Sequence, residues 1–246
     1  MVAIAPPQSN IFYPTGDGEP VAESYAHFVA ILAIFEVLQQ YLQGQQATVL
    51  ANQFLYYAPG FPRLRVAPDV LVSFGVKPGG RDSYKSWEEG SSPDVIFEVT
   101  SAGTRQKDFE EKKSLYRDLD VQEYWLFDPK GDWIPEKLRG FRLKDDAYEA
   151  IADSRSVPLD LELLVEGDLL RFRHNDTGQI LPLPLELARA LQEANRERQR
   201  IQQALQQEVE ARQQEAEARQ QEAEARQQAE MELQRYRDRF GALDAE

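Results

Sequence analysis

Three acidic residues stand in a central part of the sequence where their neighbours are mostly apolar. Asp69 and Asp94 belong to two near-copies of one phrase, Pro-Asp-Val followed by two apolar residues, at 68–72 and 93–97. Glu98 follows the second copy and interrupts a run that is otherwise typical of a buried strand. An ionised carboxylate in such a strand is costly to desolvate unless it is paired or binds a metal. Glu98 is therefore the residue most indicative of function.

The spacing of these acids predicts which of them act together. Asp94 and Glu98 lie roughly 13 Å apart along one strand, so they cannot easily share a metal ion. Asp69 opens an earlier strand and is the natural second carboxylate. Together with a backbone carbonyl such as that of Val99, Asp69 and Glu98 would form an oxygen-rich site. Such ligands suit Mg²⁺ or Mn²⁺ better than zinc.

A charged helix that follows the Glu98 strand supplies a candidate lysine. Asp108, Lys112 and Tyr116 are spaced four residues apart and therefore share one face of an α-helix. If this face looks back at the strand ends, Lys112 approaches the two carboxylates. It would then orient a water molecule and stabilise charge on a phosphate, while a metal ion lowers the pKa of that water. These groups predict hydrolysis of a phosphodiester.

Each of these residues also has a purely structural interpretation. Asp69 would cap a turn, Glu98 would pair with a lysine or arginine as a buried structural acid, and Lys112 would be a solvated helix lysine. Asp94 is predicted to be structural. His27 and His174 are the two histidines, and their spacing indicates neither a zinc site nor a catalytic triad.

The elements around these residues indicate an α/β or α+β domain with a mixed central sheet flanked by helices. Helices are expected over 23–42 and 106–119, and strands over 47–50, 53–57, 69–74, 95–100, 123–128, 141–143, 148–151 and 169–173. Residues 77–92 are polar and are expected to form a surface loop. The first helix carries Glu36 among apolar neighbours, and we keep Glu36 as a supporting residue. Glu23 and His27 are interpreted as surface groups.

The composition limits the class of protein. The net charge of −14 argues against a protein that coats nucleic acid non-specifically. It leaves room for a local basic groove, because eight basic residues flank the central stretch: Arg63, Arg65, Arg81, Lys85, Arg105, Lys107, Lys112 and Lys113. Cysteine is absent, and neither a signal peptide nor a membrane span is recognisable. We expect a cytoplasmic protein that does not bind membranes.

The composition changes near residue 184 and predicts three parts. Residues 1–20 would be a loose arm, 21–180 the sheet domain, and 185–241 one long charged helix. The heptad Ala-Arg-Gln-Gln-Glu-Ala-Glu occurs at 211–217 and again at 218–224. Glu and Arg alternate along one seam of this segment as i,i+4 pairs, whereas a strong coiled coil wants apolar residues there. The helix is therefore either a weak coiled coil that joins copies of the chain or a solvated rod.

Taken in order, these motifs resemble the PD-(D/E)xK nuclease superfamily, and more narrowly its Uma-two family of restriction-endonuclease-like proteins. The resemblance covers about residues 20–175 and rests on 67–70, 93–101, 104–108, Lys112, Tyr116 and 123–129. It implies a restriction-endonuclease-like fold, a Mg²⁺ or Mn²⁺ cofactor and DNA as the substrate. The superfamily places its lysine two residues after the glutamate, where this chain has Thr100. The family's lysine comes from the following helix, which points to Lys112, with Lys113 and Lys107 as rivals.

Two functions follow from the sequence. The first is a Mg²⁺-dependent endonuclease in which Asp69 and Glu98 hold the metal ion and Lys112 positions the attacking water. Asp108, Tyr116, Glu36 and Lys113 would support them. The second is a catalytically silent binding or assembly protein that keeps the nuclease fold and recruits partners through its C-terminal helix.

Overall fold

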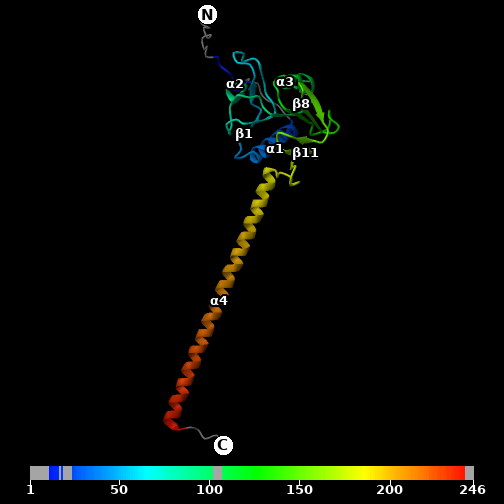
Figure 1. The fold of residues 1–246 in the computed structure, drawn as a ribbon. Coiled ribbons are helices and arrows are strands. Elements are labelled where there is room, and N and C mark those ends of the chain that lie inside the picture. The colour runs from blue at the N-terminus through cyan, green and yellow to red at the C-terminus, as the bar shows by residue number, and fades with distance from the viewer. Residues whose placement is uncertain (1–10, 17, 19–23, 102–106, 242–246) are drawn as a thin grey trace. The chain divides into compact units, whose positions relative to one another are not determined.

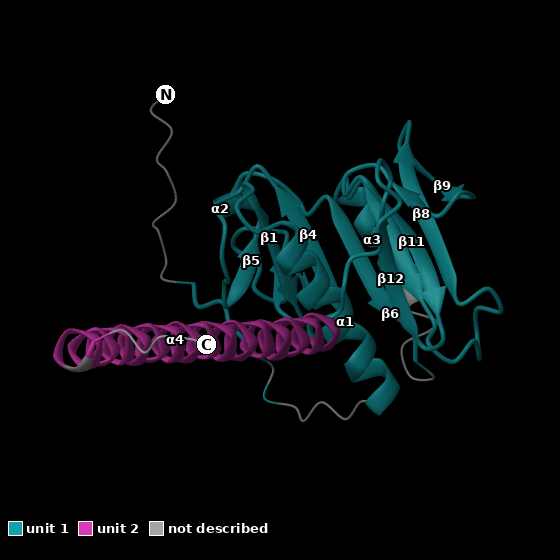
Figure 2. Cartoon of the chain, turned by 90° about the horizontal axis from the view of Figure 1, so that it is seen from below, with its two compact units in different colours: residues 1–184 teal, residues 185–246 magenta. Residues whose placement is uncertain are grey.

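The computed structural model describes residues 11–16, 18, 24–101 and 107–241, without the side chains of 107, 108 and 240. The chain divides into two compact units, residues 1–184 and 185–246 (Figure 2). The first unit contains the sheets and the short helices. The second consists of the long helix α4, Pro184–Phe240.

A six-stranded mixed sheet forms the centre of the first unit (Figure 1), in the order β1-β4-β6-β7-β8-β9. Its strands are β1 (Ala47–Ala51), β4 (Val70–Phe74), β6 (Val95–Val99), β7 (Glu123–Phe127), β8 (Leu138–Lys144) and β9 (Ala147–Ile151). Only β6 and β7 run parallel, whereas every other pair in this sheet is antiparallel. Parallel neighbours need a crossover connection, and the helical segment between β6 and β7 provides it.

Helix α1, Tyr25–Tyr41, packs on one face of this sheet. Ser24 caps the helix, because its hydroxyl accepts a hydrogen bond from the backbone N–H of His27 at 3.3 Å. Ala30, Ile34 and Leu38 are completely buried and recur at helical spacing. They pack with the apolar side chains of β4, β6 and β7 that point to this face, which forms the larger of two apolar cores.

The other face of the sheet holds the second apolar core. Ile96 of β6 and Tyr124 of β7 lie in it together with Tyr116 of helix α3, Lys113–Asp118. Alternate residues of a strand point to opposite faces, so Glu98 shares the face of Ile96. This geometry brings Glu98 under the crossover between β6 and β7.

The crossover begins with a π-helical turn, η1, Lys107–Lys112, before it becomes α3. The prediction of one α-helix over 106–119 is therefore wrong for residues 107–112, and residue 106 lies outside the described residues. A π-helix has more residues per turn than an α-helix, so the shared face predicted for Asp108 and Lys112 does not follow from their spacing. From Lys112 to Tyr116 the α-helical spacing holds.

Two smaller sheets complete the unit. The first has the order β3-β2-β5 and consists of β3 (Arg65–Val66), β2 (Phe54–Tyr56) and β5 (Ser83–Lys85). The second consists of β10 (Arg155–Ser156), β11 (Leu161–Glu166) and β12 (Leu169–His174), and α1 packs against β12. The sequence patterns missed β3, β5, β10 and β11, of which β3, β5 and β10 have only two or three residues each.

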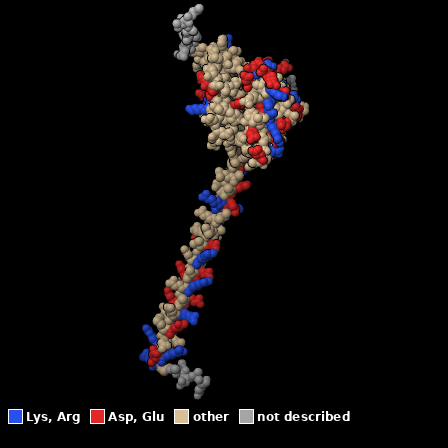
Figure 3. All heavy atoms as spheres, in the orientation of Figure 1, with Lys and Arg blue, Asp and Glu red and all other residues tan. Residues whose placement is uncertain are grey.

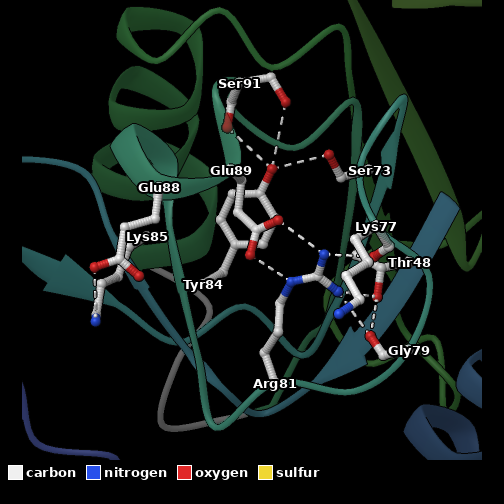
Figure 4. Close-up of polar contacts among 10 residues, drawn as sticks. All are labelled: Thr48, Ser73, Lys77, Gly79, Arg81, Tyr84, Lys85, Glu88, Glu89 and Ser91. Atoms are coloured by element: carbon white, nitrogen blue, oxygen red, sulfur yellow. Dashed lines mark hydrogen bonds and ion pairs between the residues drawn. The ribbon is translucent and has the colours of Figure 1, made fainter. Parts of the chain in front are cut away.

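The polar segment 77–92 is ordered and contains both β5 and the helix α2, Ser86–Glu89. Arg81 fixes it (Figure 4): the guanidinium forms a two-pronged ion pair with Glu89 and donates to the Thr48 hydroxyl at 2.9 Å and to the Gly79 carbonyl at 2.7 Å. The Tyr84 hydroxyl is completely buried and lies 2.9 Å from that of Ser73. The expectation of a plain surface loop is therefore wrong.

Helix α4 has 57 residues, and the side chains that the structure describes in it are exposed or nearly so. Acidic and basic side chains are interspersed along it (Figure 3). Glu208 pairs with Arg212 at 2.6 Å and Glu215 with Arg219 at 2.5 Å. Arg226 pairs with Glu230 at 3.1 Å, so the expected pairing of Glu222 with Arg226 is not the one formed. No helix in the described part of the chain is long and apolar enough to cross a membrane.

Candidate active site

Asp69 and Glu98 are cross-strand neighbours at one end of the main sheet. Val70 pairs with Phe97 in the antiparallel register of β4 and β6, which places Asp69 opposite Glu98. Residues opposite one another in such a pair have Cβ atoms about 5 Å apart. The Asp69 carboxylate also accepts a hydrogen bond from the backbone N–H of Val99 at 2.6 Å. The two acids therefore meet across neighbouring strands.

Glu98 is deeply buried and contacts two groups of the crossover. Its side chain is 1% exposed, Lys112 Nζ lies 2.7 Å from Oε2, and the Tyr116 hydroxyl donates to Oε1 at 2.6 Å. A charged partner and a hydroxyl donor offset the desolvation of the carboxylate. The interruption of an apolar strand by Glu98 is thus explained by contacts from η1 and α3.

Tyr116 is fully buried and serves as a hydrogen-bond donor to Glu98. Burial raises the pKa of its hydroxyl well above the usual value, and the nearby charge of Glu98 raises it further. The phenol therefore keeps its proton throughout the ordinary pH range. Its role is to hold Glu98 in place, since a protonated phenol of this kind is a poor base.

Two adjacent lysines of the crossover lie in different environments. Lys112 contacts Glu98, whereas Lys113 Nζ lies 3.5 Å from the centre of the Phe141 ring, in a cation–π contact. Burial and the nearby Arg139 lower the pKa of Lys113. The geometry therefore favours Lys112 over Lys113 as the lysine of the site. The side chains of Lys107 and Asp108 lie outside the described residues.

His27 of α1 belongs to the same region, contrary to the interpretation of it as a surface residue. It is 6% exposed, and its Nε2 lies 3.5 Å from Oδ2 of Asp69. The signal was present in the sequence, because His27 precedes the buried Ala30 and Ile31 by three and four residues and so shares their helix face. Phe28, the next residue along α1, is instead 55% exposed.

Glu36 is not part of this group. It lies about 13 Å further along α1 than His27, since a helix rises 1.5 Å per residue. Among the residues described, Glu36 forms no hydrogen bond or ion pair with Asp69 or Glu98. His27, in the first turn of α1, lies at the end of the sheet where the two acids lie.

Asp94 and Thr100 take structural positions at opposite ends of β6. The Asp94 carboxylate accepts from the backbone N–H of Phe74 and from the side-chain amide of Gln122, both at 2.7 Å. Burial raises its pKa above the usual value. Thr100 stands where the superfamily has its lysine, and its N–H donates to the carbonyl of Phe127 at 2.7 Å. Neither residue contacts Glu98 in the described hydrogen bonds.

The donor set suits a divalent ion that keeps water and substrate ligands. Asp69 and Glu98 are oxygen donors on neighbouring strands, and Mg²⁺ is commonly held by one or two carboxylates together with waters and phosphate oxygens. The described residues contain no group of three or more His, Cys, Asp or Glu side chains arranged for a metal ion.

The mixed sheet, with two acids on neighbouring strands and a lysine from the following crossover, defines a domain of the restriction-endonuclease-like class. Residues 5–173 match the model of the family Uma2, whose description is "Putative restriction endonuclease". This match covers more than half of the sequence, so the chain belongs to the Uma2 family. Helix α4 lies outside the matched residues.

One similar solved structure is described as a putative nuclease belonging to DUF820, from Anabaena variabilis ATCC 29413. The sequence identity is 14%, and the TM-score is 0.41. The similarity covers 60% of this chain and 74% of the other. None of the curated proteins matches the sequence.

Proposed function

We propose that the chain is a Mg²⁺- or Mn²⁺-dependent endonuclease that hydrolyses phosphodiester bonds of DNA. The observation that carries this proposal is the contact of Lys112 with Glu98, at 2.7 Å, beside a second acid on the next strand. Membership of the Uma2 family, whose description is "Putative restriction endonuclease", supports the same reaction class. Asp69, Glu98 and the Val99 carbonyl are the proposed ligands, and Lys112 is the proposed catalytic lysine.

The roles of the side chains follow from their charges and positions. The two carboxylates attract a divalent ion, and Mg²⁺, when bound, supplies a Lewis acid for the phosphate and an acidified water. Lys112 is 19% exposed at its side chain, so its ammonium can contact both the buried Glu98 and a group that enters from solvent. It holds the attacking water and stabilises charge on the phosphate. Tyr116 keeps Glu98 in position.

The charge of the chain limits how DNA would be held. Of the basic residues that flank the site in the sequence, Arg81 is committed to Glu89 and Lys85 to Glu88, while Arg65 donates to the Tyr56 hydroxyl. Arg81 and Lys85 therefore neutralise protein carboxylates before they neutralise phosphates, whereas the Arg65 partner is a neutral hydroxyl. DNA binding by this chain is therefore expected to be weak, local and sensitive to salt.

The alternative is a silent nuclease-fold protein that binds partners. One observation favours it. Both carboxylate oxygens of Glu98 accept a hydrogen bond, one from Lys112 and one from Tyr116. This arrangement fits a buried structural acid as well as it fits a metal ligand. Calorimetric titration with Mn²⁺ separates the two functions. Binding that is lost in Asp69→Asn and retained in Asp94→Asn supports the nuclease. No binding by the unaltered protein supports the alternative.

A further inference from the structure

Helix α4 exposes apolar side chains near both of its ends. Leu191, Ile201 and Leu205 near its start, and Leu233 and Tyr236 near its end, are between 53% and 63% exposed. Apolar residues so exposed on a helix are typical of a surface that associates with another helix. Because the match to the Uma2 family ends at residue 173, this surface is an addition to the family domain.

These residues belong to one seam that repeats every seven residues. Counted in alternating steps of three and four, the seam begins with Leu191 and Ala194 and continues with Arg198, Ile201, Leu205, Glu208, Arg212, Glu215, Arg219, Glu222, Arg226, Ala229, Leu233 and Tyr236. Such a spacing keeps the seam facing a neighbouring helix over its whole length. The seam is apolar towards both ends and strictly charged in the middle, where arginine occupies one heptad position and glutamate the other.

This order of charges disfavours a parallel, in-register pair of α4 helices. In such a pair every seam residue faces its own copy. Arg212, Arg219 and Arg226 would each meet an arginine, and Glu208 and Glu215 would each meet a glutamate. Like charges in contact at successive layers are destabilising.

We propose that α4 joins two copies of this chain as an antiparallel coiled coil with one defined register. When one helix is reversed, the heptad position that holds arginine in one helix faces the heptad position that holds glutamate in the other. Arginine therefore contacts glutamate. The facing pairs are then Arg212 with Glu222, Arg219 with Glu215, Arg226 with Glu208, Leu205 with Ala229, Leu233 with Ile201, and Arg198 with Tyr236, one residue of each pair coming from the second copy. Every layer combines opposite charges, two apolar groups, or a cation and an aromatic ring.

The order of residues along the seam favours this register over the registers that are shifted by one heptad. A slide by one heptad in one direction places Leu205 against Glu222 and Arg226 against Ile201. A slide in the other direction places Arg212 against Ala229. Each shift buries a charge against an apolar group, which is costly. Charged residues at seam positions weaken a coiled coil but fix its orientation and register, and that is their role here.

The charged side chains of the seam can exchange their ion pairs within one helix for ion pairs between two helices. In the single helix, Glu208 pairs with Arg212 and Glu215 with Arg219, but these four side chains are between 58% and 77% exposed. Ion pairs that are this exposed contribute little to stability. Their replacement by pairs between the two helices therefore costs little, and the apolar layers at both ends supply the attraction.

Single cysteines test the orientation directly, because the natural chain contains none. Ile201→Cys and Leu233→Cys are prepared separately in the full-length protein and oxidised alone or as an equal mixture. In the antiparallel register, Cys at 201 lies beside Cys at 233 of the second copy and roughly 50 Å from its own counterpart, at 1.5 Å per residue. Disulfide dimers are therefore expected in the mixture and not in either variant alone.

Two results would overturn the proposal. A disulfide dimer of Ile201→Cys alone would establish the parallel arrangement. A monomeric mass for the unaltered protein in sedimentation equilibrium, at concentrations up to about 100 times those of an ordinary activity assay, would leave α4 as a solvated rod.

A charge exchange gives a second test that needs no cysteine. Arg219→Glu places glutamate against Glu215 in the antiparallel pair and should weaken dimerisation at least tenfold. The double variant Arg219→Glu with Glu215→Arg restores opposite charges and should recover most of that loss. In a parallel pair the layers of residues 215 and 219 each contain like charges in the unaltered protein, in the single variant and in the double variant. Dimerisation that is equally strong in all three proteins therefore contradicts the proposal.

Discussion

Lys112 Nζ lies 2.7 Å from Oε2 of Glu98, and this contact joins the crossover between β6 and β7 to the strand on which the acid lies. The lysine is partly open to solvent, whereas the glutamate is buried. A buried acid and an accessible base in contact can serve as a structural ion pair or as two components of a hydrolytic site. The predictions below distinguish these roles.

Lys112→Met should lower the rate of DNA cleavage by at least about 100-fold, because it removes the positive charge proposed to stabilise the phosphate. Lys113→Met is the matched control, since the neighbouring lysine contacts the Phe141 ring instead of Glu98. It should retain cleavage within about twofold of the unaltered rate, as a residue remote from the transition state does. Rates are measured on supercoiled plasmid at saturating Mg²⁺. A loss of cleavage in Lys113→Met but not in Lys112→Met would show that Lys112 is not the catalytic lysine.

Tyr116→Phe should lower the free energy of unfolding by about 1.5–3 kcal/mol, because it removes a hydrogen bond to a buried charged group while it keeps the ring. Tyr41→Phe is the comparison, since the Tyr41 hydroxyl donates to the neutral carbonyl of Leu159 at 3.0 Å. It should cost about 0.5–1.5 kcal/mol. Urea unfolding of both variants measures the difference. Equal effects would mean that the hydrogen bond to Glu98 contributes no more than a hydrogen bond to a neutral acceptor.

Asp94→Asn should change how stability depends on pH and leave cleavage intact. Burial raises the folded-state pKa of Asp94, so its proton is bound more tightly in the folded chain than in the unfolded chain. The stability that Asp94 contributes is therefore present in acid and is lost as the pH rises through its raised pKa. The stability of the unaltered protein relative to Asp94→Asn should fall from acid to neutral pH. Urea unfolding at several pH values tests the sign, and a rise would contradict it.

The sequence predicted the elements with strong patterns and missed those fixed by distant contacts. Strands β4, β6 and β7 are apolar runs, and α1 has a clear helical period, so their residue ranges were nearly correct. The segment 77–92 is polar, and its order depends on Arg81, whose partner Thr48 lies far away in the sequence. No local pattern contains that information.

The candidate site was predictable only where it depends on local strand patterns. Strand spacing ruled out Asp94 as the partner of Glu98 and left Asp69, on another strand, as the candidate. The adjacency of Asp69 and Glu98 follows from the register of β4 and β6. His27 was interpreted as a surface group, although it shares the helix face of the buried Ala30 and Ile31. The α-helical spacing of Asp108, Lys112 and Tyr116 gave no indication of the π-helical turn at η1. This turn alters which residues of the crossover share a face with Lys112.

Plasmid cleavage by the unaltered protein, Asp69→Asn and Glu98→Gln, with Asp94→Asn as the control, tests the central claim most directly. Supercoiled DNA is incubated with each protein in Mg²⁺, in Mn²⁺ and in EDTA. The account predicts metal-dependent cleavage by the unaltered protein and by Asp94→Asn, and none by the other two variants, with all four proteins folded by circular dichroism. Cleavage by Asp69→Asn and Glu98→Gln at the unaltered rate, or cleavage that persists in EDTA, would contradict it.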